Sequence, residues 1–429
     1  MKKIILIFLS VCIFVSALSF GNVTAYADEK DIYEYLLEKT ADFETEVDIA
    51  PFVKSNSWDI EDIKSIIKDF FLSEPTLFYV GEEKGISYSA DLSRVYLIFE
   101  YDYTKDEVSA MQKEMKKAAQ KAVASITDDM TDVEKALVVH DYLIMNCDYD
   151  HESHKRTAYD CLVNKEAVCQ GYSLAFLYIM RDFLDIECSI VYSDSQNHSW
   201  NYIKIGKNWY HVDVTADDPT FTSFSGKSYD GKGEILHENF MLSDKAIKKS
   251  SGLHRKWETM GKPAASNEKY DDYFWRSSTS AMYKIDGLWY YTVLDKSSPG
   301  VNYKKGGDKE VYTKLCTYDF KTKKSTELKK IEDMWTLYRN SKTGEKLDGL
   351  SWYKKSYMKL VQVGDYLYYN TSKAVYRFNP ETGKTKKVYT LKKENMQIFS
   401  MVPYGSSAIR LVYKKDLSYS NKYIKLKIS

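Results

Sequence analysis

The sequence has no surplus of charge of either sign and, beyond its first 27 residues, no long apolar run. Lysine and arginine together number 61, as do aspartate and glutamate, so the formal net charge is zero. Because nucleic-acid-binding proteins usually carry a basic surplus, we expect no nucleic-acid partner. No segment after residue 27 has the roughly 20 consecutive apolar residues of a membrane helix, so we expect no stable membrane insertion of the mature chain.

Cysteine is scarce as well. Five cysteines are spread over the residues that follow residue 27: Cys147, Cys161, Cys169, Cys188 and Cys316. So low a density excludes a disulfide framework, and the odd number leaves at least one thiol unpaired. Cys147 with His151 and His154 lacks the spacing and the fourth ligand of a closed zinc site. We therefore expect no metal and no other cofactor, and one cysteine that is kept for chemistry.

The first 27 residues have the pattern of a secretory signal peptide. Lys2 and Lys3 precede an apolar run from 4 to 20, and the small-residue cleavage site Ala25-Tyr26-Ala27 follows it. We expect cleavage after Ala27 and a secreted, extracellular protein, with association to the cell surface as an open alternative.

The remaining chain is longer than one hydrophobic core usually accommodates, which predicts more than one domain. Residues 28–125 are predicted to be a mainly helical N-terminal extension, with helices in "DIYEYLLEKTADF" and "DIEDIKSIIKDFFL" and a strand in "RVYLIFEYDY". Residues 126–260 are predicted to form the core. The Gly, Pro, Ser and Asn content of residues 261–272 indicates a linker.

Residues 273–429 are predicted to form a Tyr-rich β-repeat domain. "IDGLWYY" is echoed by "VGDYLYY", "TYDFKTKKS" is echoed by "VYRFNPETGKTKK", and "SSAIRLVY" followed by "YIKLKI" is a third, weaker echo. Repeated short antiparallel strands are typical of propeller blades. Three units are too few to close a ring by themselves, so we expect a propeller-like array. We interpret the lysine runs between the strands as solvated turns and not as a binding patch.

Two capping boxes predict where helices of the core region begin. Thr104 with Glu107, and Thr131 with Glu134, have the S/T-x-x-E spacing of a helix N-terminus. His140 lies at the edge of the apolar stripe of the second helix. We interpret it as a hydrogen-bonded structural histidine.

Cys169 in "EAVCQGYSLAF" precedes a dense apolar segment that is typical of a buried helix. Gly171 permits close approach of the backbone. At a helix N-terminus the unpaired N–H groups and the helix dipole favour a thiolate, which is the reactive form of cysteine. A buried, inert thiol is the alternative.

The segment "HSWNYIKIGKNWYHVDV" predicts two strands joined by a tight turn at Gly206-Lys207. A two- or four-residue loop places His198 and Asp213 on the same face, about 7–8 Å apart at the backbone. A three-residue loop without a bulge would place them on opposite faces. A thiol with such a His–Asp pair forms a set of nucleophile, base and orienting group. His211 shares the face of Asp213 and stays open as an alternative base.

Three blocks, "VCQGYS", "HSWN" and "WYHVDVTADDP", resemble the signature of the transglutaminase-like (papain-like thiol) superfamily in its bacterial secreted branch. The resemblance covers about residues 126–258, including "MTDVEKALVVHDYLIMNCDYD" and "NFMLSDKAI". It implies an α+β fold with a papain-like core of helices on an antiparallel sheet. It also implies that Cys169 is the nucleophile, His198 the base and Asp213 the orienting group. "HSW" stands where the family usually has "HAW", and Asp160 where glycine is frequent.

This set implies acyl transfer from an amide of a protein or peptide substrate, with a cell-wall peptide as one option. The thioester would pass to an amine, giving transamidation, or to water, giving a peptidase or amidase. The oxyanion would be stabilised by the Cys169 N–H and a second donor, for which Asn164 and Gln170 are candidates.

Other residues have structural interpretations. Asp217 and Asp218 are interpreted as shaping a turn rather than binding calcium, and Trp200 and Trp209 as packing the hairpin. The alternative function is a catalytically silent surface-binding protein that works through the β-repeat domain. The sequence does not predict the oligomeric state.

Overall fold

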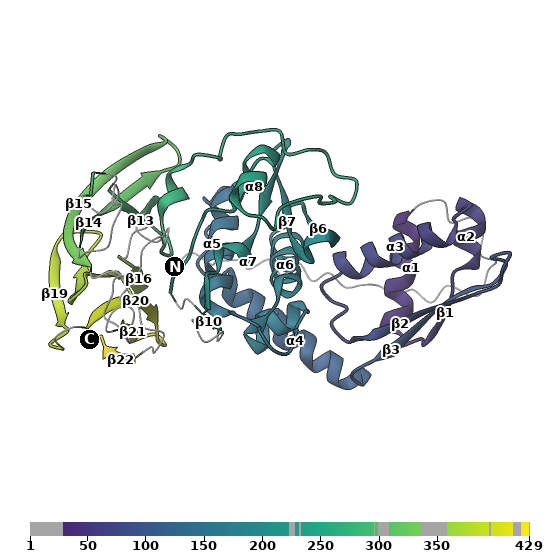
Figure 1. Ribbon diagram of the computed structural model, residues 1–429. Helices are drawn as coiled ribbons and strands as arrows, with labels where there is room; N and C mark the ends of the chain where they lie inside the picture. Colours follow the sequence, from purple (N-terminus) through teal and green to yellow (C-terminus); the bar gives the residue numbers. More distant parts are fainter. Residues whose placement is uncertain are drawn as a thin grey trace, which may run out of the picture. The chain divides into compact units, whose positions relative to one another are not determined.

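The computed structural model (Figure 1) describes residues 29–222, 228–230, 233–295, 297–298, 309–335, 358–393, 396–414 and 422–428. The predicted signal peptide lies outside these residues. Within them, no helix has both the length and the apolar character needed to cross a membrane. The chain divides into two compact units, Met1–Lys68 with Val80–Asp102 and Asp69–Tyr79 with Tyr103–Ser429. The domain boundaries inferred from composition near residues 125, 260 and 272 stay predictions.

The first unit combines helices with a small antiparallel sheet in the order β1-β3-β2. Its elements are α1 (Glu29–Ala41), β1 (Glu46–Asp48), α2 (Ala50–Asn56), most of α3 (Ile60–Ser73), β2 (Val80–Tyr88) and β3 (Val95–Tyr101). Helices α1 and α3 and strand β3 confirm the three predicted segments. Strand β2 was not predicted, because "VGEEKGISY" has little of the β-branched and aromatic content that marks a strand.

The second unit contains an α+β core. Four antiparallel strands in the order β11-β8-β7-β6 form its sheet, and the buried helix α6 contacts β6 and β7. The sheet and the main helices are α4 (Lys105–Ala122), α5 (Asp132–Asn146), α6 (Cys169–Leu177), β6 (Cys188–Ser193), β7 (His198–Ile205), β8 (Asn208–Val212), β11 (Phe240–Leu242) and α8 (Asp244–Ser250). Helices therefore pack on an antiparallel sheet, as expected.

Shorter elements connect the parts of this core. They are β4 (Asp148–Tyr149), the π-helical turns η1 (Asp160–Asn164) and η2 (Tyr178–Phe183), β5 (Glu166–Ala167), the 3-10 turn η3 (Asp194–Gln196), α7 (Val214–Asp217), β9 (Thr220–Thr222) and β10 (Ser228–Asp230). Both predicted capping boxes are formed. The side chains of Thr104 and Thr131 accept from the N–H of Glu107 and Glu134, and the two glutamates bond back to the threonine N–H groups.

After a 3-10 turn, η4 (Phe274–Ser277), the chain continues as three antiparallel meanders. The first is β12 (Tyr283–Ile285), β13 (Leu288–Leu294), β14 (Lys309–Asp319) and β15 (Lys324–Trp335). The second is β16 (Leu360–Val363), β17 (Tyr366–Asn370), β18 (Ala374–Phe378) and β19 (Thr385–Thr390). The third is β20 (Gln397–Pro403), β21 (Ala408–Lys414) and β22 (Lys422–Lys427).

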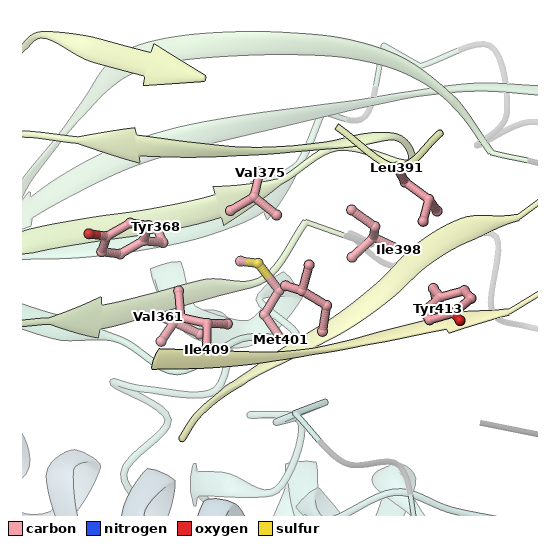
Figure 2. Packing of buried hydrophobic residues seen from close by; sticks show 9 residues of the cluster. Val361, Tyr368, Val375, Leu391, Ile398, Met401, Ile409 and Tyr413 are labelled. Atoms are coloured by element: carbon pink, nitrogen blue, oxygen red, sulfur yellow. The ribbon is translucent and has the colours of Figure 1, made fainter. Parts of the chain in front are cut away.

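The meanders agree with the three sequence echoes, and across the described strands they stay separate sheets and form no closed barrel. The second and third sheets share one hydrophobic core, which Figure 2 shows with Val361, Val375, Ile398 and Ile409 among its residues. The lysine runs at 321–324 and 384–387 are exposed, but Lys386 lies within edge strand β19 and not in a turn. Charged side chains on an edge strand discourage pairing with other chains.

The predicted linker carries no helix or strand but packs on the core. The Tyr202 hydroxyl donates to the carbonyl of Pro263 (3.0 Å), and Asp271 accepts from the N–H of Ser243 at the start of α8 (2.8 Å). Beyond it, the indole N–H of Trp289 in the first sheet donates to the capping-box carboxylate of Glu134 (2.7 Å). The first sheet is therefore hydrogen-bonded to the start of α5.

His140 is a buried structural histidine, as interpreted from the sequence. Its Nδ1 lies 2.9 Å from Asp141 Oδ1 and its Nε2 3.1 Å from Asp217 Oδ2. Burial acts to lower the pKa of His140, but the hydrogen bonds and charges of the two carboxylates outweigh it and raise the pKa to about 9. The protonated form is therefore stabilised by folding.

This raised pKa predicts a pH dependence of stability. The contribution of His140 is fully present below its unfolded pKa of about 6.5 and is lost as the pH rises through about 9. We expect the melting temperature to fall across this window, and to fall less steeply in the His140→Gln variant. Parallel pH profiles of the two proteins, measured by calorimetry, would contradict this role for His140.

Candidate active site

Cys169 is the first residue of α6, and it follows the N-cap Val168 in extended conformation. The preceding strand β5 pairs in parallel with β4, so that Tyr149 lies opposite Ala167. Glycine is needed at position 171, because a Cβ there would lie 2.7 Å from the Ala167 Cβ and 3.0 Å from the Thr157 carbonyl oxygen. The sequence-based placement of Cys169 at a helix start is confirmed.

The β7–β8 hairpin has a two-residue turn at Gly206-Lys207, one of the two loop lengths predicted from the sequence for this pairing, with Ile205 opposite Asn208. Extending this register by one residue sets Asp213 opposite Trp200, on the side that His198 occupies two residues earlier. The two side chains meet, with His198 Nε2 2.7 Å from Asp213 Oδ2. Asp213 is also the N-cap of α7, since its Oδ1 accepts from the N–H of Ala216 (2.9 Å). The carboxylate is thereby fixed in orientation.

The thiol, imidazole and carboxylate interact electrostatically. Burial acts to raise the pKa of Cys169, but the hydrogen bond and charge of His198 outweigh it, so that the pKa lies below its ordinary value. Burial acts to lower the pKa of His198, and the charge and hydrogen bond of Asp213 raise it to about 10. The pKa of Asp213 lies below its usual range because the two histidines around it offset its burial. These directions favour a thiolate–imidazolium pair.

Other thiols lack this environment. Burial raises the pKa of Cys188 to about 12 and that of Cys316 to about 11. Burial and the neighbouring Cys147 thiol raise the pKa of Cys161 well above its ordinary value. Among the cysteines that the structure describes, Cys169 alone has a resolved lowering of its pKa.

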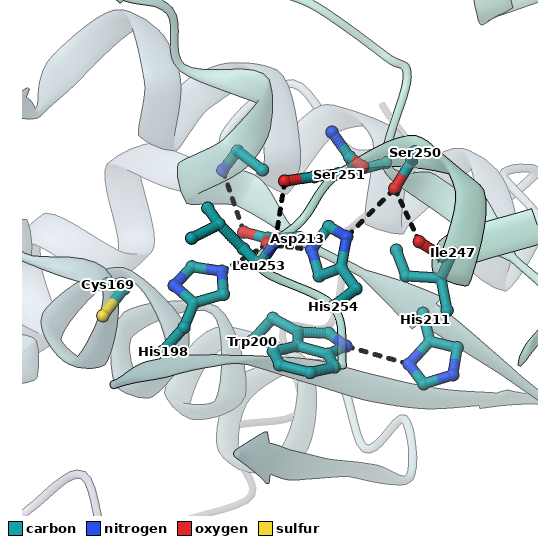
Figure 3. A network of polar contacts seen from close by, with 12 residues as sticks. Cys169, His198, Trp200, His211, Asp213, Ile247, Ser250, Ser251, Leu253 and His254 are labelled. Atoms are coloured by element: carbon teal, nitrogen blue, oxygen red, sulfur yellow. Dashed lines mark hydrogen bonds and ion pairs between the residues drawn. The ribbon is translucent and has the colours of Figure 1, made fainter. Parts of the chain in front are cut away.

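His254, which the sequence did not predict as part of the site, is a second histidine next to the Asp213 carboxylate (Figure 3). Its Nε2 lies 2.7 Å from Asp213 Oδ2, and its Nδ1 lies 3.0 Å from the Ser250 hydroxyl. Asp213 thus bridges two buried histidines. Trp200 contacts both of them: its ring stacks on His198 at 5.5 Å between centroids and meets His254 edge-on at 5.0 Å. No local pattern in "LHRKW" indicated this role.

The structure does not place the alternative base, His211, at the thiol. Its Nδ1 accepts from the Trp200 indole N–H at 2.9 Å (Figure 3). Its Nε2 lies 2.8 Å from Asp244 Oδ1. Both ring nitrogens are therefore engaged away from Cys169. The hydrogen bond from Trp200 to His211 holds the indole ring that stacks on His198.

Of the candidate oxyanion donors, Asn164 is exposed and its amide donates to Asp160 Oδ1 (2.8 Å). Tyr149 is half-buried, and its hydroxyl forms no hydrogen bond within the described part of the chain. Burial, followed by the negative charges of Cys169, Asp150 and Asp213, raises the pKa of Tyr149. The raised pKa favours the protonated phenol, and Tyr149 interacts electrostatically with the thiol, which sequence reasoning missed.

Among the residues that the structure describes, two groups have ligand atoms close enough to hold a metal ion: His198, Asp213 and His254, and His140, Asp141 and His237. In each, hydrogen bonds between the carboxylate and both imidazoles already account for the arrangement. The side chains of Asp217 and Asp218 bond to distant segments and not only within the predicted turn: Asp217 accepts from the Asn239 N–H, and Asp218 from the Tyr172 hydroxyl.

The helices packed on an antiparallel sheet define an α+β core, which carries a thiol near a hydrogen-bonded His–Asp pair. Residues 116–214 match the model of the Transglutaminase-like superfamily, and Cys169, His198 and Asp213 all lie within the match. This segment of the chain belongs to the transglutaminase-like superfamily.

Further comparisons are distant. No curated protein matches the chain significantly. Two solved extracellular domains from B. thetaiotaomicron, assigned to a one-component system and a hybrid two-component system, are 13% and 12% identical with TM-scores of 0.20 and 0.19. The alignments cover 55% of this chain but only 33% and 32% of those chains. Scores of this size establish no common overall fold.

Proposed function

We propose that this protein is a cysteine-dependent enzyme that transfers acyl groups from amide bonds of protein or peptide substrates. The observation that carries the proposal is the His198–Asp213 hydrogen bond beside a thiol whose pKa is lowered by that histidine. Acyl transfer through a covalent thioester uses such a nucleophile, base and orienting carboxylate. The superfamily of residues 116–214 supports the same class of reaction.

In the proposed reaction, the sulfur of Cys169 attacks the amide carbonyl and His198 takes the thiol proton. Because Nε2 of His198 is bonded to Asp213, Nδ1 is the nitrogen left for the thiol. The amine leaves with that proton, and a thioester remains. An amine then attacks the thioester in transamidation, or water attacks it in hydrolysis, and the thiol is regenerated. Asp213 stays ionised and holds the imidazole in one orientation.

We propose that the Cys169 N–H and the Tyr149 hydroxyl stabilise the oxyanion of the tetrahedral intermediate. The support is the pairing of β4 with β5, which sets Tyr149 beside the approach to Cys169, and the electrostatic interaction of the phenol with the thiol. A protonated hydroxyl that has no other acceptor in the described structure is suited to a negative charge that develops only during the reaction.

Tyr149→Phe tests this donor. We expect kcat to fall about 100-fold with little change in KM, because one preorganised oxyanion donor is removed. The rate of Cys169 alkylation should stay near that of the wild type, since alkylation forms no oxyanion. Unchanged kcat in a folded Tyr149→Phe variant would remove Tyr149 from the mechanism.

One assay tests the proposed reaction and separates its two outcomes. The protein is incubated with a glutamine-containing protein and a fluorescent primary amine, with Cys169→Ala as the matched control. Covalent transfer of the label shows transamidation, whereas ammonia or new chain termini without label show hydrolysis. No product above the Cys169→Ala background across a range of peptide amides would leave the surface-binding alternative.

We also propose an extracellular place of action, with cell-wall peptides among the substrates. The support is the signal-peptide pattern of the first 27 residues. The three meanders are proposed to belong to a propeller-like array that holds the target, as their consecutive strand order would allow.

A further inference from the structure

The chain is neutral as a whole, but its C-terminal segment has few acidic residues and therefore a surplus of basic ones. Residues 358–429 contain 14 lysines and arginines and only four acidic residues, whereas the whole chain has 61 of each kind. This segment forms the second and third sheets, which share one hydrophobic core (Figure 2). The segment that contains these two sheets therefore carries a surplus of ten positive charges.

In the third sheet, two positively charged side chains lie directly opposite each other on neighbouring strands, an arrangement that strand pairing alone does not favour. Arg410 of β21 lies directly opposite Lys425 of β22. Both cations lie over the ring of Tyr404, each 4.6 Å from its centroid. Within the described residues neither forms an ion pair with a carboxylate. Like charges directly opposite each other destabilise a sheet, and the cation–π contacts offset only part of that cost.

The second sheet repeats this arrangement. Arg377 of β18 lies directly opposite Lys386 of edge strand β19. The Arg377 guanidinium lies 4.4 Å from the centroid of the Tyr366 ring. Two successive sheets thus each combine an arginine on a tyrosine with a lysine across from it.

The first sheet shows how the chain neutralises such a pair. Lys314 of β14 lies directly opposite Lys330 of β15. Lys314 forms an ion pair with Glu327 at 2.8 Å, and Asp295 lies 3.4 Å from the Lys330 ammonium. Carboxylates therefore accompany the cations of the first sheet, whereas Arg410 and Lys425 have no such partner in the described structure.

We propose that the second and third sheets bind a linear anionic glycopolymer, whose repeated acid groups pair with Arg410–Lys425 and Arg377–Lys386. Tyr404 (41% exposed) and Tyr423 (50%) offer exposed aromatic surface for contact with sugar rings. Single-stranded nucleic acid would need free ring faces for base stacking, and the Tyr404 ring carries two cations. The inference rests on this charge arrangement and not on the proposed acyl transfer.

Binding of polygalacturonate to the full chain tests the inference. At about 50 mM salt we expect binding that weakens steeply by about 200 mM, because counterions are released. Arg410→Gln/Lys425→Gln should weaken binding roughly tenfold and lower the salt slope by about two. The matched control Lys314→Gln/Lys330→Gln, which also removes an opposed cationic pair, should change affinity less than about twofold because carboxylates already neutralise that pair. Because the two positive charges repel each other, Arg410→Gln/Lys425→Gln should not lower the melting temperature. The single variant Lys425→Gln, at an exposed position, gives a second measurement of binding.

Several outcomes would overturn the inference. They are no binding of polygalacturonate at low salt, binding of neutral dextran with equal affinity, or an equal loss in the Lys314/Lys330 control. Tighter binding of single-stranded DNA or of anionic phosphatidylglycerol vesicles would assign the surface to another ligand. Cys169→Ala should bind as the wild type does, so a failure of this inference is distinguishable from a failure of the proposed catalysis.

Discussion

Iodoacetamide is expected to modify Cys169 at least about 1000-fold faster than the buried Cys188 at neutral pH, because the thiolate is the reactive form. His198 lowers the pKa of the Cys169 thiol, whereas burial raises that of Cys188 to about 12. The rate of Cys169 modification should stay high below pH 9, which is the ordinary pKa of a cysteine thiol. His198→Ala should move this profile to higher pH, because it removes the hydrogen bond and charge that stabilise the thiolate.

Labelled peptides identified by mass spectrometry give the measurement, with Cys169→Ala as the control for residual labelling. Cys147 or Cys188 labelled as fast as Cys169 in the folded protein would sink the assignment of the nucleophile. An unshifted profile in His198→Ala would remove the imidazole from thiol activation.

Turnover should fall by about 10⁴-fold in Asp213→Asn, because the imidazole loses the carboxylate that orients it. His198→Ala should cost more, since it removes the base itself. Asparagine keeps the size of Asp213, so the buried histidines on either side of it are not left facing a cavity. Both variants should remain folded, which their melting temperatures will check.

Two matched histidine variants complete this experiment. His254→Gln keeps an N–H that can reach Asp213 and should lose only about tenfold, as a positioning residue. His211→Gln should cost less than His198→Ala, because His211 contacts Trp200 and Asp244 and not the thiol. Activity in His198→Ala comparable to the wild type would contradict the proposed base.

Features fixed by local interactions could be predicted from the sequence. Helix α5 begins at the capping box of Thr131 and Glu134, because both hydrogen bonds lie within four residues. The hairpin register follows from the two-residue turn at Gly206-Lys207. That register brings His198 and Asp213 together, so most of the candidate site was accessible to sequence reasoning.

Contacts between distant segments could not be predicted. His254 reaches Asp213 across 41 positions, and Trp289 reaches Glu134 across 155, with no periodic pattern to indicate either pair. Tyr149 was missed for a similar reason. Its place beside the thiol depends on a two-residue parallel pairing between β4 and β5, which is too short to leave a signal in the sequence.

Glu134 links the start of a helix to a sheet that the ribosome synthesises about 150 residues later. One carboxylate completes the capping box of α5, accepts from Trp289 and lies 3.1 Å from the Lys284 ammonium. Until the first β-meander has been made, only the capping-box donors of Thr131 can reach this carboxylate. We therefore expect the contacts of Glu134 with Trp289 and Lys284 to stabilise helix α5 only after the C-terminal half of the chain has been synthesised.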